Sequence, residues 1–100
     1  AFSTFANRGV RNEPTLISRI DQVDEEGRVS VVRQHRPTGE RVMTEEEADL
    51  VNYCLRQVVL DGTGSSASFG KPAAGKTGTT QDYKDAWFVG YTPRLTAAVW

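Results

Sequence analysis

The chain has 100 residues, 12 of them basic and 13 acidic, and a formal net charge of −1 at pH 7. These charges are spread along the chain, so they indicate neither a nucleic-acid partner nor an anionic membrane. The length suffices for one domain with a modest core, and the single Cys54 cannot form an internal disulfide. No apolar run approaches the roughly 18 residues that a membrane-spanning helix needs.

The first third of the sequence predicts a short helix followed by a hairpin. Apolar residues recur within 1–6 and are followed by a polar stop that ends in glycine, which is typical of the last turns of a buried helix. Two β-leaning runs, joined by an acidic turn that ends in Gly27, predict a hairpin over 15–34. His35 has no second ligand candidate beside it, so we expect an exposed loop residue. No chemistry is expected of this region.

The clearest helix begins after Thr44. Thr44 and Glu47 have the spacing of a capping box, and Gly62 lies where a C-terminal stop is expected. The apolar residues that recur at helical spacing, and that should cover a sheet, are Ala48, Val51, Cys54, Leu55, Val58 and Val59. Because Cys54 lies among them, we expect a buried and unreactive thiol.

Residues 70–91 bring small residues, hydroxyls and one cation next to an apolar run, and two motifs compete for them. Gly70-x-x-x-x-Gly75-Lys76-Thr77 matches the phosphate-binding P-loop, and the run that starts at Lys76 matches the lysine-threonine-glycine signature of penicillin-recognising enzymes. A P-loop needs a buried strand before it and a helix that starts at its Lys-Thr. Here a Gly/Ser-rich linker precedes the motif and an aromatic, β-branched run follows it. Nucleotide binding is therefore the less favoured alternative.

The same stretch is better explained by two antiparallel strands. We predict one strand over 76–80 and a returning strand over 87–91, joined by a turn. Side chains alternate along an extended chain, so Thr77 and Thr79 should share one face and Lys76 should lie on the other. At a sheet edge, both faces and the unpaired backbone groups can reach a ligand.

A family resemblance rests on two runs of residues, which are Ala74-Gly75-Lys76-Thr77-Gly78-Thr79-Thr80 and Asp85-Ala86-Trp87-Phe88-Val89-Gly90-Tyr91-Thr92-Pro93. Together they resemble the transpeptidase domain of class A, or bifunctional, penicillin-binding proteins. The resemblance implies an α+β fold with an antiparallel sheet packed by helices, as in penicillin-binding proteins and serine β-lactamases. It also implies that residues 1–100 are an incomplete C-terminal segment of one such domain, with a hairpin excursion at 15–34.

The resemblance further implies an enzyme that cross-links peptidoglycan stem peptides ending in D-Ala-D-Ala through a serine acyl-enzyme, and that β-lactam antibiotics acylate. Lys76 would supply a positive charge for catalysis, and the backbone N–H of Thr79 would form part of the oxyanion hole. The substrate-binding residues would be Thr77, Gly78, Thr79 and Thr80. No cofactor and no metal are expected.

The rest of the machinery is expected outside these residues. The nucleophile of this family normally lies in a Ser-x-x-Lys motif, with a Ser-x-Asn motif opposite. Ser68-Phe69-Gly70-Lys71 matches the first motif, but Gly70 and Pro72 oppose the helix that it requires, and no Ser-x-Asn occurs. We therefore expect one wall of a cleft, inactive alone, whose partner is the remainder of the same transpeptidase domain.

The resemblance also implies a location and leaves one alternative of the same architecture. A class A protein would lie on the extracytoplasmic face of the bacterial membrane, anchored outside these residues, and would carry a glycosyltransferase domain. The alternative is a non-catalytic sensor module for β-lactams or peptidoglycan. Sequence alone does not separate the two.

Overall fold

The computed structural model describes the backbone of residues 1–100 and every side chain except that of Tyr83. Its helices are α1 (Phe2–Ala6) and α2 (Glu45–Leu60), with short 3-10 turns η1 (Ser65–Ala67) and η2 (Gln81–Tyr83). Its strands are β1 (Val10–Arg11), β2 (Arg19–Val23), β3 (Val29–Gln34), β4 (Glu40–Arg41), β5 (Ala74–Thr79), β6 (Ala86–Tyr91) and β7 (Thr96–Val99). No helix in this described chain is long and apolar enough to cross a membrane.

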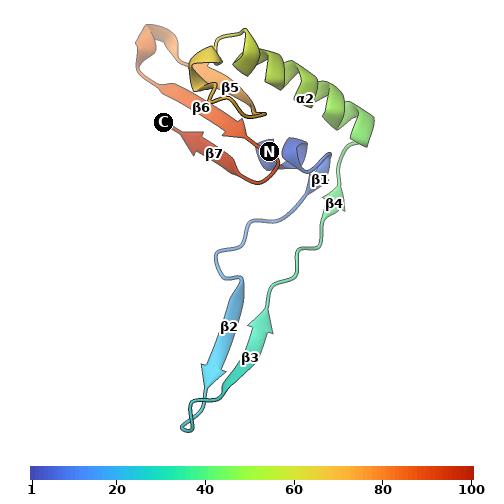
Figure 1. Cartoon of the computed structure of the whole chain (residues 1–100), viewed down its shortest axis with the longest axis vertical. Helices are drawn as coiled ribbons and strands as arrows, with labels where there is room; N and C mark the ends of the chain where they lie inside the picture. The colour runs from blue at the N-terminus through green and yellow to red at the C-terminus, as the bar shows by residue number, and fades with distance from the viewer.

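The molecule consists of a body and a projecting arm (Figure 1). In the body, α1 and α2 flank a three-stranded antiparallel sheet of order β5-β6-β7. The arm comprises residues 12–39 and contains the antiparallel pair β2-β3, and β1 and β4 pair at its base. The overall extents of 58 × 33 × 28 Å reflect the length of this arm.

Within the sheet, the ring of Phe88 packs against two glycines, Gly75 and Gly90. A Cβ atom on Gly75 would lie 2.7 Å from Phe88 Cζ, and one on Gly90 would lie 2.6 Å from Phe88 Cε1. Real Cβ atoms do not approach so closely, so both positions need glycine for the ring to pack flat on the strands. The two strands predicted over 76–80 and 87–91 are confirmed as β5 and β6, each starting earlier than predicted.

Helix α2 begins as the sequence predicts. Thr44 Oγ1 accepts a hydrogen bond from the Glu47 N–H (3.2 Å), and Glu47 Oε2 accepts one from the Thr44 N–H (2.8 Å), which completes the capping box. Ala48 and Val59 are the buried residues of the helix. The prediction of a buried Cys54 is wrong, because this thiol is exposed. The inner stripe of α2 passes through Ala48, Asn52 and Val59 at helical spacing, and Cys54 lies beside it.

Asn52 is the polar residue of that inner stripe, and two hydrogen bonds account for its place there. The Tyr91 hydroxyl donates a hydrogen bond to Asn52 Oδ1, and Asn52 Nδ2 donates one to the Phe5 carbonyl (3.0 Å). Tyr91 is only 7% exposed, and burial raises the pKa of its hydroxyl. One amide thus joins the sheet, α2 and α1.

The arm has no buried residue in either of its two main strands. Strand β2 starts at Arg19, so the first part of the predicted 15–34 hairpin is not strand. At the tip, Asp24 Oδ1 accepts hydrogen bonds from the N–H groups of Glu26 and Arg28, and the side-chain hydrogen bond from Arg28 lowers the pKa of Asp24. His35 is exposed, as expected.

Candidate functional site

Strand β5 lies at an edge of its sheet, and its backbone groups divide between β6 and that edge. Beyond the last pair of the ladder, the Thr80 N–H donates to the Asp85 carbonyl at 3.1 Å. Bonded and non-bonded pairs alternate in an antiparallel ladder, so Lys76 and Gly78 direct their N–H and C=O groups to β6. The backbone groups of Thr77 and Thr79 therefore point away from β6, towards the open edge.

The two halves of β5 differ in burial. Ala74 is 4% exposed and Gly75 is also buried, whereas Gly78 and Thr79 are exposed. A Cβ atom built on Gly78 would meet only Trp87 Cβ, at an ordinary 3.5 Å. The second half of the strand therefore presents space beside its backbone.

The Lys76 ammonium lies against this second, exposed half of β5. Its Nζ atom donates to the Thr77 carbonyl at 2.9 Å and lies 3.4 Å from Thr77 Oγ1. On the other side, Thr77 Oγ1 lies 2.9 Å from Thr63 Oγ1. One cation and two hydroxyls thus meet beside outward-facing backbone groups, which is a suitable arrangement for an anionic ligand.

Thr63 is the member of this cluster that the sequence did not predict. It lies in the Gly/Ser-rich loop between α2 and β5, where only a flexible border was expected. Its two glycine neighbours, Gly62 and Gly64, are the signal that was available, because paired glycines flanking one hydroxyl indicate a close backbone approach.

Thr80 is placed differently from the other predicted site residues. Its Oγ1 accepts a hydrogen bond from the Asp85 N–H (2.9 Å) and lies 3.4 Å from Asp85 Oδ2. Asp85 also accepts a bond from Trp100 Nε1 (3.0 Å). The Thr80 hydroxyl therefore closes the turn between β5 and β6.

The competing motifs do not have the backbone that they need. Lys76 lies inside β5, so no helix begins there to form a P-loop. Ser68 is the C-cap of η1, and Gly70 has φ 77°, so no helix brings Lys71 onto Ser68. The rejection of both readings is supported by this geometry.

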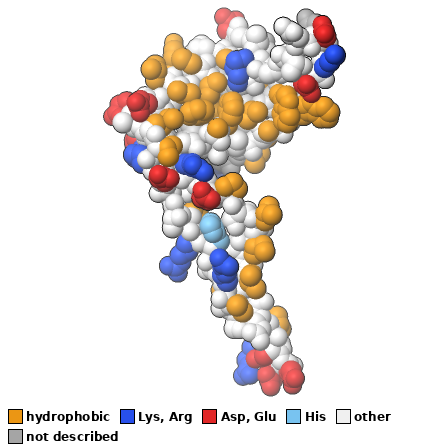
Figure 2. All heavy atoms as spheres, turned by 180° about the vertical axis from the view of Figure 1, so that it is seen from behind, with side chains coloured by type: hydrophobic (Ala, Val, Ile, Leu, Met, Phe, Trp, Pro, Cys, Tyr) orange, Lys and Arg blue, Asp and Glu red, His pale blue; other side chains and the backbone are white. Residues whose placement is uncertain are grey.

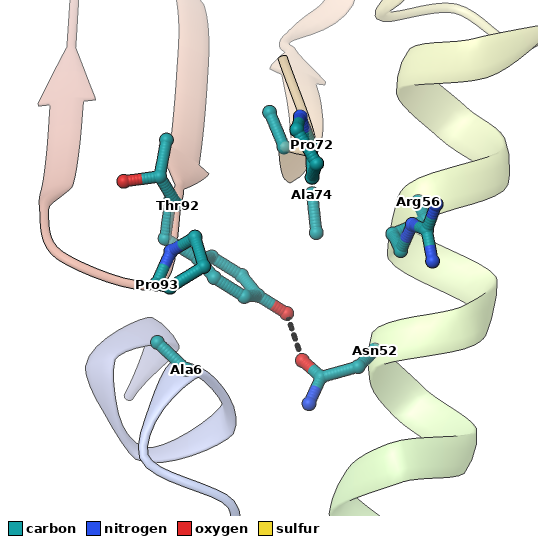
Figure 3. A pocket seen from close by; sticks show the side chains of 9 residues that line it. Ala6, Asn52, Arg56, Pro72, Ala74, Thr92 and Pro93 are labelled. Carbon is teal, nitrogen blue, oxygen red and sulfur yellow. Dashed lines mark hydrogen bonds between the residues drawn. The ribbon is translucent and has the colours of Figure 1, made fainter.

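A cavity of about 260 Å³ lies at the other end of β5, between the strand, α1 and α2 (Figure 3). Its labelled side chains include Asn52 and Arg56 of α2, Ala74 of β5 and the apolar Ala6 and Pro93. Tyr91 and Asn52, which share a hydrogen bond, both line this cavity, and none of Lys76 to Thr79 lines it. Within the described side chains, no group of three or more His, Cys, Asp and Glu residues could hold a metal ion.

The α+β architecture and the Lys-Thr-Gly-Thr edge strand agree with the class of penicillin-recognising enzymes. The sequence profile of the family described as "Penicillin binding protein transpeptidase domain" matches residues 1–100. The chain therefore belongs to the penicillin-binding protein transpeptidase family.

Named relatives narrow the likeness to class A proteins. The chain is 42% identical over 106 residues to "Penicillin-binding protein 1F" of Bacillus subtilis (strain 168), and 43% identical over 101 residues to "Penicillin-binding protein 1A" of Aquifex aeolicus (strain VF5). Both alignments cover 100% of this chain. The chain spans only 14% and 13% of those two proteins.

Solved structures give the same fold. A structure of the "D,D-Transpeptidase Domain of Peptidoglycan Glycosyltransferase" from Eggerthella lenta superimposes with a TM-score of 0.74 and 33% identity, covering 91% of this chain and 22% of that one. Penicillin-binding protein 2B of Streptococcus pneumoniae (strain R6) superimposes with a TM-score of 0.70 over 92% of this chain and 17% of that one. At 23% identity the second likeness supports the fold alone.

Proposed function

We propose that residues 1–100 form the C-terminal part of the transpeptidase domain of a class A penicillin-binding protein and supply the Lys-Thr-Gly-Thr wall of its active site. The observation that carries this proposal is the meeting of the Lys76 ammonium and the Thr77 hydroxyl at the open half of β5. The nucleophilic serine and the Ser-x-Asn residues would lie elsewhere in a longer protein, of which this chain is one piece. Residues 1–100 alone would be inactive.

The wall would bind the terminal carboxylate of a stem peptide that ends in D-Ala-D-Ala, or the carboxylate of a β-lactam. Lys76 contributes the charge, and the hydroxyls of Thr77 and Thr79 contribute hydrogen bonds. The space beside Gly78 lets the peptide lie against β5 as an added antiparallel strand. Thr80 would act indirectly, by fixing the turn that follows the strand.

The chemistry would be acyl transfer. A serine hydroxyl from the rest of the domain attacks the carbonyl of the penultimate D-alanine, the serine proton is passed to the leaving amine, and the terminal D-alanine departs. An acceptor amine then displaces the serine from the ester. The Thr79 N–H would stabilise the oxyanion, a type of contribution worth about 3 kcal/mol in the transition state. A β-lactam would acylate the serine by opening its ring.

Two features of the longer protein belong to the same proposal. Its transpeptidase domain would lie on the extracytoplasmic face of the bacterial membrane, anchored by a segment outside these residues. A glycosyltransferase domain would accompany it, as in a bifunctional enzyme. The family resemblance implies both features, and the Eggerthella lenta domain that this chain resembles comes from a protein described as a peptidoglycan glycosyltransferase.

The test measures acylation by labelled penicillin in the longer protein that contains these residues. Lys76→Met should lower the acylation rate on the order of a hundredfold, because one preorganised charge is lost from the site. Lys71→Met is the matched control: it removes an exposed lysine outside β5 and should leave the rate unchanged. Equal rates for Lys76→Met and the unaltered protein would overturn the proposal.

The same protein separates the remaining alternatives. Cross-linking of stem peptides alongside penicillin acylation is expected of a transpeptidase. Acylation without cross-linking would favour a sensor module. Saturable binding of ATP with magnesium, lost in Lys76→Met, would favour the P-loop reading.

A further inference from the structure

We propose that Thr63 is a positioning residue of this wall: it holds the Thr77 hydroxyl so that the single Thr77 proton is directed to the substrate carboxylate. The inference rests on the proposed function and adds to it a residue outside the Lys-Thr-Gly-Thr motif. Its starting observation is the 2.9 Å separation of Thr63 Oγ1 and Thr77 Oγ1, two atoms from residues 14 positions apart.

The loop that carries Thr63 is packed tightly onto the last turns of α2. A Cβ atom on Gly62 would lie 2.8 Å from Val58 Cα and 2.9 Å from Val58 O. The Gly64 N–H donates to the same Val58 carbonyl at 3.0 Å. Only glycine at position 62 permits such a close approach to Val58, so Gly62 allows the loop to pack against α2.

The same loop also touches the sheet directly beneath the site. A Cβ atom on Gly64 would lie 3.3 Å from Phe88 Cε2, and Gly64 is buried. Phe88 stands opposite Thr77 in the β5-β6 ladder. Thr63 is therefore fixed between α2 and the strand by its two neighbours, and its hydroxyl meets Thr77 from a rigid support.

Counting donors and acceptors gives the direction of the bond. A threonine hydroxyl has one proton and two lone pairs, whereas an ammonium group only donates and a carboxylate only accepts. Lys76 Nζ can therefore only donate to Thr77 Oγ1. When Thr77 gives its proton to a carboxylate, the bond from Thr63 to Thr77 must be donated by Thr63. Both lone pairs of Thr77 Oγ1 then accept hydrogen bonds, so the Thr77 proton is directed towards the carboxylate.

Loss of the Thr63 hydroxyl should affect ligand capture more than folding. Thr63 is exposed and Thr77 is half-buried, so water can replace the bond in the empty site at little cost in stability. In the occupied site, the Thr77 hydroxyl would be free to rotate, and its bond to a charged carboxylate would weaken. Such bonds are stronger than those between neutral groups.

The experiment compares Thr63→Val, Thr63→Ser and the control Ser65→Ala in the longer protein, using labelled penicillin. Thr63→Val keeps the β-branched shape and should lower the second-order acylation constant about tenfold, the effect of one hydrogen bond on a charged group. Thr63→Ser retains the hydroxyl and should restore the rate. Ser65→Ala removes a neighbouring exposed hydroxyl and should change nothing.

A second ligand distinguishes positioning from a structural role. The carboxyl methyl ester of the same penicillin is neutral at the group that Thr77 binds, so Thr63→Val should slow its acylation little, as measured by mass spectrometry of the intact protein. Equal losses on acid and ester, or a lowered thermal midpoint, would overturn the inference, as would a rate unchanged in Thr63→Val. If the unaltered protein is not acylated at all, the proposed function itself fails.

Discussion

Side-chain contacts within the body join residues far apart in the sequence, whereas the ion pairs within the arm join close sequence neighbours. In the body, Arg8 donates to Asp49 across 41 positions of sequence, and Tyr91 bonds Asn52 across 39. In the arm, the ion pairs of Arg19 with Asp21 and of Arg28 with Asp24 and Glu26 span four positions or fewer. A substitution in the body can therefore reach the β5 edge through its packing partners, whereas one in the arm should stay local.

The arm also exposes hydrophobic side chains on the surface of its strands. Figure 2 shows acidic side chains gathered at its tip and hydrophobic ones along one side. Val29, Val31 and Val32 are each more than half exposed. The register shifts opposite Val32, and charged Arg19 and Asp21 lie on the neighbouring strand. Such irregularities and charges disfavour the addition of another strand.

The largest expected effect within the body comes from Gly75→Val. The new side chain would collide with Phe88 Cζ and with Val89 O, so we expect a loss of about 3 kcal/mol of unfolding free energy in the transpeptidase domain. Urea unfolding of the longer protein measures this loss.

Gly78→Val is the matched variant three positions along the same strand. Its Cβ atom would make only an ordinary contact with Trp87 Cβ at 3.5 Å, so stability should stay within about 0.5 kcal/mol of the unaltered protein. The same side chain would occupy the place proposed for the substrate backbone, and acylation by labelled penicillin should fall on the order of a hundredfold. Normal acylation in a folded Gly78→Val protein would show that the ligand does not lie on this edge.

A smaller effect is expected from the Tyr91 hydroxyl, and it depends on pH. Burial raises the pKa of Tyr91 above its value in the unfolded chain. Its contribution to stability should therefore be complete below about pH 10, where an unfolded tyrosine ionises, and be lost as the pH rises through the pKa of the folded state. Tyr91→Phe should remove this alkaline decline and cost about 1 kcal/mol at neutral pH, because Asn52 loses its donor.

Tyr53→Phe provides the comparison for that measurement. Tyr53 lies on α2 but is 63% exposed, so its replacement should change neither the neutral-pH stability nor the alkaline decline. Denaturant unfolding of the three proteins between neutral and alkaline pH separates the two tyrosines. Identical alkaline profiles for Tyr91→Phe and the unaltered protein would contradict the assignment to Tyr91.

Local sequence signals predicted the elements that these variants probe. The capping box at Thr44 gave the start of α2, and the aromatic and β-branched content of 86–91 gave β6, with β5 as its antiparallel partner. Each signal lies within one element, where propensity and capping act over a few residues. The P-loop match failed because its surroundings are wrong: a Gly/Ser-rich linker precedes it where a buried strand is needed, and a run that favours a strand follows it where a helix is needed.

Local sequence signals did not predict the contacts between elements. The bonds of Thr63 with Thr77 and of Asn52 with Tyr91 join separate elements, and periodicity does not say which residues face each other across them. Cys54 illustrates the limit: a count of apolar positions placed it in the core, but the sheet meets the stripe that contains Asn52. Which side of an apolar helix face is covered depends on the partner element.

The smallest effect is expected from removing the outer part of the arm, residues 19–34, which contains β2 and β3. The His35 N–H donates to the Ser18 carbonyl at 2.8 Å, so the ends of the excised segment are adjacent, and an Asn-Gly turn can replace residues 19–34. No buried side chain is lost with these strands, so unfolding free energy should change by less than about 1 kcal/mol and acylation by less than about twofold. Asp24→Asn, which only weakens the tip, is the milder control. A tenfold loss of acylation in the excised protein, with stability retained, would mean that the arm acts on the β5 edge despite the short range of its contacts.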